Sequence, residues 1–458
     1  MSSHSLSLHS YNEVEIKQFQ KHLIDFYEET KRVLPWRKKG CDLPAKDAPL
    51  NEWETPIQRL YEVLVSEIML QQTRVETVKR YYNKWMETLP TLQACAEADY
   101  NTQVMPLWSG MGFYTRCKRL HQACQYLAGL KPKEIPLSAE KWSKDIPGVG
   151  PYTAGAVLSI AWKQPTGIVD GNVIRVLSRA LAIHSDCSKG KANTLIWELA
   201  NALVDPERPG DFNQALMELG AITCTPQSPQ CSTCPVSDIC KGYQEQIVIS
   251  DKKKLKYDIE DGPCSICSTD PPSAETLQNW VVNRYPIRPQ KTKQREERAL
   301  VAIFQKTDPE TKEKLFLIRK RPTVGLLAGL WDFPTMEYGE DAWPKDIEAE
   351  FKRCLNLWLQ KENLCVKKHQ SRGRYLHIFS HIRKTSHVFY AIVTPETKTK
   401  EDFFWISQSD LDHVGMCELG LKNYRGALDL KKRKLTSLSN FKAPTLIPAK
   451  QQNVKAEA

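Results

Sequence analysis

The stretch IPGVGPYTAGAV, from Ile146 to Val157, has two glycines one residue apart, followed by a run of small and apolar residues. A dinucleotide-binding loop is one candidate, but its G-x-G-x-x-G pattern follows a strand. Here the glycines are Gly148, Gly150 and Gly155, and the preceding EKWSKD favours a helix. We therefore expect a short hairpin between two helices, whose exposed backbone amides can bind a phosphate. A plain helix–helix turn, with glycine for steric reasons, is the alternative.

The composition of the chain limits its class. It has 458 residues, 41% of them hydrophobic, and a formal net charge of +10. The length suggests two or three domains, and the charge favours an anionic partner without proving one. No apolar run is long enough to cross a membrane, and the N-terminus lacks the apolar core of a secretory signal. The 14 cysteines are scattered, so we expect reduced thiols and metal ligands rather than a disulfide framework.

Hydrophobic periodicity changes character along the chain. Arg59–Leu70 and Val75–Met86 carry apolar residues at helical spacing. Strand-like runs occupy Ala299–Phe304, Lys314–Ile318 and His387–Val393, and the Pro- and charge-rich stretch before them is typical of a connector. The predicted segments are a flexible N-terminus (1–13), a helical domain (14–243), a connector (244–296), an α+β domain (297–430) and a loose basic tail (431–458).

Four cysteines form a C-x6-C-x2-C-x5-C pattern: Cys224, Cys231, Cys234 and Cys240. Thiolates so closely spaced can satisfy one tetrahedral zinc ion. They can equally hold an iron–sulfur cluster. The spacing alone leaves both open.

Two carboxylates stand in suggestive surroundings. Glu67 lies among apolar residues in VSEIMLQQT, where burial raises the pKa of a carboxyl and keeps a proton available. Asp170 precedes Gly171 at an expected helix start, where capping is its simplest role. Together they suit cleavage of an N-glycosidic bond, in which a base leaves with a proton and the sugar passes through an oxocarbenium-like cation.

Several segments together resemble the endonuclease-III superfamily of DNA glycosylases, and within it the MutY family of adenine glycosylases. They are SEIMLQQTRVETV, LWSGMGFYTRCKRL, IPGVGPYTAGAV, VDGNVIRVLSRA, FNQALMELGAITCT and the cysteine pattern. The resemblance implies a mainly α helix–hairpin–helix glycosylase domain with a [4Fe–4S] loop, and an α+β Nudix-like C-terminal domain. It also implies a monomer that removes adenine paired with 8-oxoguanine, and with guanine, in double-stranded DNA during base excision repair.

The same resemblance assigns roles to residues. Glu67 is the general acid, Asp170 stabilises the cation or bonds to it, and Tyr152 and Asn172 support them. Arg37 and Glu218 match positions in the adenine pocket. The DNA contacts it implies are Gly148 and Gly150 in the hairpin, with Gln71 and Phe113 entering the base stack. The family usually has tyrosine where this chain has Phe113, so the stacking face is kept and a hydroxyl is lost.

Tyr152 also bears on the product. Superfamily members that cut the DNA strand use a lysine 18 residues before the aspartate, and its amine forms a Schiff base. Here that position is Tyr152, and a phenol forms no imine. The resemblance therefore implies a monofunctional hydrolase that leaves an abasic site.

In the second domain, GLLAGLWDFP and HIFSHIRKTSHVF resemble the Nudix-like domain of the MutY family. The R-E-x-x-E-E core that binds Mg²⁺ in Nudix hydrolases is missing, which disfavours nucleotide hydrolysis. The resemblance implies instead that Phe379, Ser380 and His381 recognise 8-oxoguanine. A simple turn at the end of a strand is the alternative reading of Ser380 and His381.

The connector holds a second C-x2-C, Cys264 and Cys267. Vertebrate members of the family have a linker zinc site with three cysteines and a distant histidine; here the third cysteine is missing, and Tyr257 occupies its neighbourhood. A modified zinc site completed by His4, His9 or Cys41 and two unliganded cysteines are the two alternatives.

Partner and address signals are weaker. Asp258–Asp261 is similar to a linker segment that contacts a sliding clamp, and Leu435–Phe441 to a clamp-binding peptide without its leading glutamine. Lys431–Lys434 is a candidate nuclear address or a solvated basic tail. The resemblance implies sliding clamps and an abasic-site endonuclease as partners, a nuclear location with the mitochondrion as a second one, and no membrane.

Overall fold

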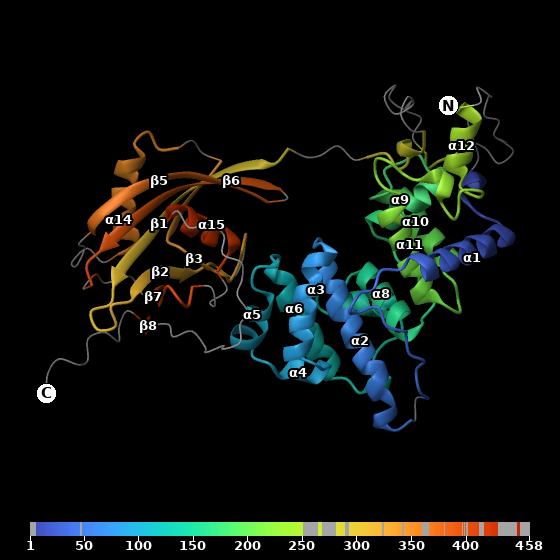
Figure 1. Ribbon diagram of the computed structural model, residues 1–458, viewed down its shortest axis with the longest axis horizontal. Helices are drawn as coiled ribbons and strands as arrows, with labels where there is room; N and C mark the ends of the chain where they lie inside the picture. Colours follow the sequence, from blue (N-terminus) through green and yellow to red (C-terminus); the bar gives the residue numbers. More distant parts are fainter. Residues whose placement is uncertain are drawn as a thin grey trace. The chain divides into compact units, whose positions relative to one another are not determined.

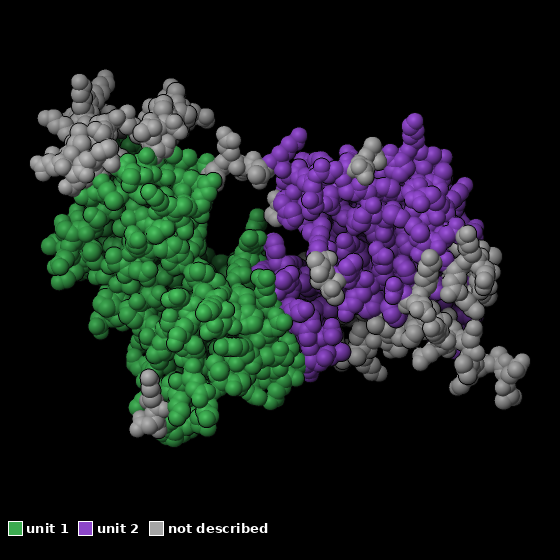
Figure 2. All heavy atoms as spheres, turned by 180° about the vertical axis from the view of Figure 1, so that it is seen from behind, with its two compact units in different colours: residues 1–98, 119–290 green, residues 99–118, 291–458 purple. Residues whose placement is uncertain are grey.

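The computed structural model divides the chain into two compact units, residues 1–98 with 119–290, and residues 99–118 with 291–458 (Figure 2). The residues it describes are 6–45, 48–250, 264–267, 281–288, 293–322, 325–340, 343–359, 366–379, 381–395, 397, 399, 402–411, 416–428 and 447–448. His4, Tyr257, Asp258–Asp261, Ser380, Lys431–Lys434 and Leu435–Phe441 lie outside them.

The described residues up to Ser250 form helices and the loops that join them (Figure 1). These are α1 (Glu13–Thr30), α2 (Leu50–Leu70), α3 (Val75–Thr88), α4 (Leu92–Glu97), α5 (Met105–Trp108), α6 (Tyr114–Ala128), α7 (Ala139–Asp145), α8 (Pro151–Trp162), α9 (Gly171–Ala180), α10 (Gly190–Leu203), α11 (Pro209–Ile222) and α12 (Lys241–Ser250). The helices expected from apolar spacing in Arg59–Leu70 and Val75–Met86 are confirmed as parts of α2 and α3. None of the described helices is both long enough and apolar enough to span a bilayer.

Helix α8 forms the centre of the first unit. Every residue from Thr153 to Trp162 is buried, as expected for a helix that is apolar on all sides. Helices α2, α7 and α11 pack against it. This packing places the first turn of α8 beside α2 and α11, which carry Glu67 and Glu218 of the site below.

The second unit is built on one mixed sheet. Its strands are β1 (Arg295–Thr307), β2 (Lys314–Lys320), β3 (Trp331–Asp332), β4 (Thr335–Gly339), β5 (Val366–Ile378), β6 (Ile382–Val393), β7 (Phe403–Ser407) and β8 (Ile447–Pro448). The order is β5-β6-β1-β2-β7-β8, with β3 paired to β2 and β4 to β1. Strands β1 and β6 are parallel and the other pairs antiparallel. The three strand-like runs are confirmed in β1, β2 and β6.

Alternate residues of the sheet face two separate cores, as the two-residue period of a strand requires. In β1, Leu300, Ala302 and Phe304 face α14 (Ile347–Trp358). Val301 and Ile303 face the opposite core, which contains residues of α15 (Glu418–Ala427). The sheet with a helix on each face confirms the α+β expectation.

Candidate functional site

The acid expected from sequence meets the tyrosine expected beside it. Glu67 projects from α2 and is buried. The Tyr152 hydroxyl, from the first turn of α8, donates to its Oε2 at 2.8 Å. Burial raises the pKa of Glu67 to about 7; the Tyr152 hydrogen bond opposes the shift, and the nearby Asp170 charge adds to it. A carboxyl with this pKa carries a proton near neutral pH, as a general acid requires.

Asp170 caps α9 and faces the same cavity. The backbone N–H groups of Asn172 and Val173 donate to its Oδ1 at 2.9 and 2.7 Å, and Asn172 Nδ2 donates to Oδ2 at 2.9 Å. The capping role considered from sequence is therefore real. It does not compete with a role in chemistry, since the cap fixes the direction in which the carboxylate is presented.

A cavity of about 280 Å³ joins these groups. Its wall contains all six residues assigned to catalysis or to the adenine pocket: Glu67, Tyr152, Asp170, Asn172, Arg37 and Glu218. They come from α2, α8, α9, α11 and the segment after α1. Folding thus brings together every residue of that predicted set, in a concave site of the size that small ligands occupy.

An arginine that the sequence reading missed completes one wall. Arg32 donates to Glu218 from Nε at 2.6 Å and from Nη2 at 2.7 Å, and Arg37 Nη2 donates to it at 2.8 Å. Burial alone raises the pKa of Glu218, but the hydrogen bonds from Arg32 and Arg37 outweigh it and leave that pKa below its ordinary value. Glu218 is therefore an ionised acceptor in the cavity wall. The signal that could have revealed Arg32 is its position five residues before Arg37, which was already assigned to the adenine pocket.

The hairpin between α7 and α8 has the geometry of an anion site. Gly148 has φ +76°, and a Cβ there would lie 2.5 Å from the Cβ of Arg119. Gly150 is the N-cap of α8, makes no side-chain cap, and has open space where a Cβ would be. Neither glycine carries a side chain over its own backbone amide, an arrangement that can accept an anion. Gly150 is two residues before Tyr152, which contributes to the cavity wall.

The two residues expected to enter the base stack lie in strained loops. Gln71 ends α2, the next residue, Gln72, has φ 55°, and Gln71 Nε2 donates to Thr153 Oγ1 at 3.2 Å. Phe113 itself has φ 52° and its side chain is 51% exposed. Left-handed backbone costs a non-glycine residue roughly 1–2 kcal/mol, and such strain gathers at functional sites. Phe113 belongs to the 99–118 segment that is grouped with the second unit.

The four cysteines Cys224, Cys231, Cys234 and Cys240 line one pocket. Burial raises the pKa of the Cys231 thiol to about 11 and of Cys234 to about 12. Four thiolates in such a place need metal cations to balance them, so the residues fit a cluster. Arg179 of α9 donates from Nη1 to Cys224 Sγ at 3.3 Å and to the Thr225 carbonyl at 2.7 Å.

Helix α9 links the cysteine pocket to the cavity. Arg175 donates from Nε to the Cys224 carbonyl at 2.8 Å and from Nη2 to Asn172 Oδ1 at 2.8 Å. Asn172 in turn holds Asp170. Sequence reasoning did not single out Arg175 or Arg179; their spacing of three and seven residues from Asn172 on one helix face was the signal.

A second cysteine site involves the N-terminus. Cys264 Sγ and Cys267 Sγ lie 3.4 and 3.2 Å from His9 Nε2, and the potential ligand atoms all lie within 4.8 Å of one another. His9 Nδ1 donates to the Leu181 carbonyl at 2.8 Å, which leaves Nε2 as the ligand atom. Of the residues considered from sequence, His9 lies beside the two cysteines, Cys41 lines a different pocket, and His4 is outside the described residues.

In the second unit, Phe379 and His381 belong to the turn between β5 and β6. His381 is exposed, and the Phe379 ring lies 4.5 Å from the ring of His377. A turn was the alternative to lesion recognition considered from sequence, and that turn is present. A projecting turn with an aromatic and an imidazole is compatible with either role.

Three parts of the chain match known protein families. Residues 65–202 match the HhH-GPD superfamily of base excision DNA repair proteins, 224–240 the iron–sulfur binding domain of endonuclease III, and 310–422 the NUDIX domain. The middle match favours an iron–sulfur cluster over zinc for the four cysteines.

Individual proteins extend these matches. The adenine DNA glycosylase of Schizosaccharomyces pombe is 75% identical over 457 residues, covering 100% of this chain and 99% of the yeast protein. That of Homo sapiens is 38% identical over 431 residues, covering 91% of this chain and 75% of the human protein. A solved thermostable thymine-DNA glycosylase aligns with 51% of this chain and 98% of its own, at 24% identity and a TM-score of 0.41. The yeast similarity includes both units and the connector.

Proposed function

Since this chain belongs to the adenine DNA glycosylase family, we propose that it removes adenine paired with 8-oxoguanine, and with guanine, by hydrolysis that leaves an abasic site. Adenine excision in base excision repair is the activity of the family. The mispair and the product are the specific parts of the proposal. The observation that carries it is the buried Glu67, which accepts a hydrogen bond from Tyr152 on the wall of a cavity that it shares with Asp170, and whose pKa burial raises to about 7.

Each step can be assigned to a side chain. Glu67 gives its proton to a ring nitrogen of adenine, and the bonding pair of the C–N bond leaves with the base. The sugar becomes an oxocarbenium-like cation, which the Asp170 carboxylate stabilises. Water then adds to the anomeric carbon, and its proton returns to Glu67. Base and hydroxylated sugar are the products, so atoms and charge balance.

The proposal that the DNA strand stays uncut rests on Tyr152. It occupies the lysine position of strand-cutting relatives, and its hydroxyl is already committed to Glu67. Burial holds the pKa of this phenol well above its ordinary value, so it is a neutral hydrogen-bond donor and no amine nucleophile is supplied from this position.

Borohydride trapping of the enzyme on DNA should therefore be weak. Trapping as strong as that of a lysine lyase would favour the rival function, that of a bifunctional enzyme for oxidised pyrimidines.

Adenine must leave the duplex to enter the cavity. The hairpin amides of Gly148 and Gly150 suit the phosphate backbone, and Gln71 and Phe113 suit the space left in the stack. Phe379, Ser380 and His381 are proposed to contact the 8-oxoguanine that remains. The turn carrying Phe379 and His381 supports this role through its exposure.

The cysteine loop binds an iron–sulfur cluster of the endonuclease III type, for which we propose the [4Fe–4S] form and a structural role. In the connector, His9, Cys264 and Cys267 would supply three of the four ligands of a zinc ion. Clamp binding and the nuclear address remain proposals from sequence, because Asp258–Asp261 and Lys431–Lys434 lie outside the described residues.

The decisive test is a single-turnover assay on duplexes with A:8-oxoguanine, A:G and A:T, in which released adenine and strand scission are measured separately. We expect adenine release from the first two without scission, and none from the Glu67→Gln variant. Full activity of that variant would overturn the acid assignment. A non-catalytic damage binder would hold the mispair and release nothing, and a nucleotide-pool hydrolase would consume free 8-oxo-dGTP with Mg²⁺.

A further inference from the structure

The turn that carries Phe379 and His381 is anchored from the start of β1. The Arg295 backbone N–H donates to the His381 carbonyl at 3.0 Å, and the Phe379 N–H closes the turn on the Ile382 carbonyl at 2.8 Å. A third anchor comes from a side chain: Gln294 Nε2 donates to the Phe379 carbonyl at 2.8 Å. Gln294 thus holds the backbone of the aromatic residue itself.

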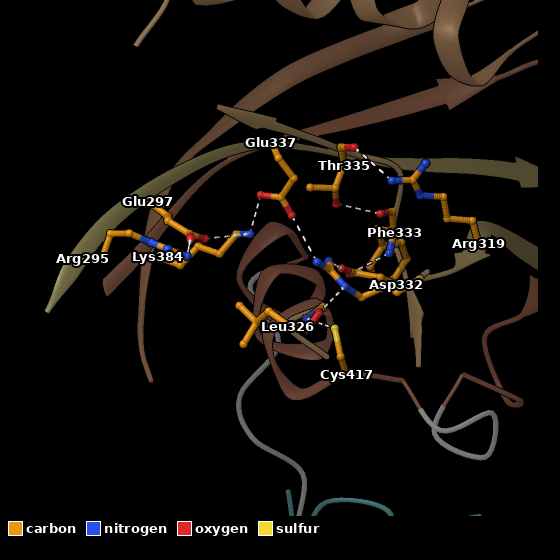
Figure 3. A network of polar contacts seen from close by, with 12 residues as sticks. Arg295, Glu297, Arg319, Leu326, Asp332, Phe333, Thr335, Glu337, Lys384 and Cys417 are labelled. Atoms are coloured by element: carbon orange, nitrogen blue, oxygen red, sulfur yellow. Dashed lines mark hydrogen bonds and ion pairs between the residues drawn. The ribbon is translucent and has the colours of Figure 1, made fainter. Parts of the chain in front are cut away.

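The base of this turn is fixed by ion pairs between three strands (Figure 3). Lys384 of β6 is buried and pairs with Glu337 of β4, and lies 3.7 Å from Glu297 of β1. Arg321 continues the network, 3.3 Å from Glu337 and 2.6 Å from Asp332. Since a buried lysine needs these carboxylates, the strands are locked together at the end from which the turn projects.

The described residues around the turn are open to solvent. His381 is exposed, and Ile378, the last residue of β5, is 58% exposed. Strand β5 is at the edge of the sheet. In a solvent-exposed segment at a sheet edge, backbone hydrogen bonds contribute much of what fixes the conformation. Gln294 joins that segment to the locked base.

We propose that Gln294 is a positioning residue for lesion recognition: its amide fixes the Phe379 carbonyl, and with it the direction in which the Phe379 ring leaves the turn. The inference rests on the proposed function, because it assumes that this turn contacts 8-oxoguanine. If Gln294 positions the turn that recognises the lesion, replacing it changes the preference for A:8-oxoguanine over A:G, and not the stability of the fold alone.

The measured quantity is the ratio of single-turnover adenine release from A:8-oxoguanine to that from A:G, with full-length, cluster-loaded protein below saturating concentration. Gln294→Ala removes the hydrogen bond to the Phe379 carbonyl, which lowers this ratio by roughly two- to tenfold. Gln294→Glu keeps the shape but sets a carboxylate oxygen against the Phe379 carbonyl oxygen, so its ratio falls further than that of the alanine variant.

Gln370→Ala is the matched control, since Gln370 is exposed on β5 and lies opposite Tyr390, away from the turn. Its ratio should equal that of the wild type. Thermal midpoints are recorded for all variants. A fall in midpoint with an unchanged ratio in both Gln294 variants would mean a structural role only, and would overturn the inference.

Phe379→Ala separates the inference from the function beneath it. If Phe379→Ala lowers the ratio and neither Gln294 variant does, positioning by Gln294 is wrong while recognition by the turn stands. If Phe379→Ala leaves the ratio unchanged, recognition by the turn is wrong, and the inference falls with it. Lowered ratios for both Phe379→Ala and Gln294→Ala, with a still lower ratio for Gln294→Glu, support the inference.

Discussion

The Tyr152 hydroxyl lies 2.8 Å from the Glu67 carboxylate and joins the first turn of α8 to the last turn of α2. Those two helices are also the ones that position the hairpin and the acid. One contact therefore joins the helix that follows the hairpin to the carboxyl proposed as the general acid. Its strength can be tested through the pH dependence of the reaction.

Tyr152→Phe should move the alkaline limb of the pH–rate profile upward. We expect wild-type kcat/KM for adenine release to fall as pH rises through about 7, the pKa to which burial raises Glu67, because the acid loses its proton. The hydrogen bond from Tyr152 lowers that pKa, so its removal shifts the fall to higher pH even if the maximal rate drops. An unmoved limb would show that another group controls it.

Glu67→Gln should make the protein more stable at alkaline pH. Burial raises the pKa of Glu67 from 4.5 to about 7 in the folded state. The folded protein therefore loses stability as pH rises from the unfolded value to the folded one, by about 3 kcal/mol. Glutamine cannot ionise and avoids this loss. The difference in unfolding free energy between the two proteins, measured by urea titration at pH 4.5 and pH 8, should grow in favour of the variant.

The hairpin glycines offer a matched pair. Gly148→Ala requires a left-handed residue and a Cβ 2.5 Å from that of Arg119, so we expect a loss of about 2 kcal/mol in stability. Gly150→Ala meets open space and should change the thermal midpoint of the DNA-free protein very little. Equal midpoints for the two variants would contradict the described hairpin geometry.

His9→Ala should lower the zinc content of the purified protein. Elemental analysis of the wild type should give about one zinc per chain if His9, Cys264 and Cys267 bind it. His22→Ala, on α1 and outside that group, serves as control, and absorbance of the iron–sulfur cluster reports that the variant is folded. A wild type free of zinc would leave the two cysteines unliganded, the other alternative considered from sequence.

Local sequence patterns determined much of this protein. The spacing of Cys224 to Cys240, the two-glycine hairpin, Glu67 in an apolar helix and Asp170 before a helix start all follow from short-range geometry. These features could be assigned because hydrogen bonds and side-chain periods act over a few residues. The position of Tyr152, where strand-cutting relatives have a lysine, came instead from the resemblance to the family.

Tertiary structure alone decided the partnerships between distant residues. Arg32 meets Glu218 across 186 positions, His9 meets Cys264 across 255, and Gln294 meets Phe379 across 85. None has a periodic signature, since each depends on how α1, the connector and the first strand of the sheet pack after the local elements have formed. Close packing of those elements sets these distances.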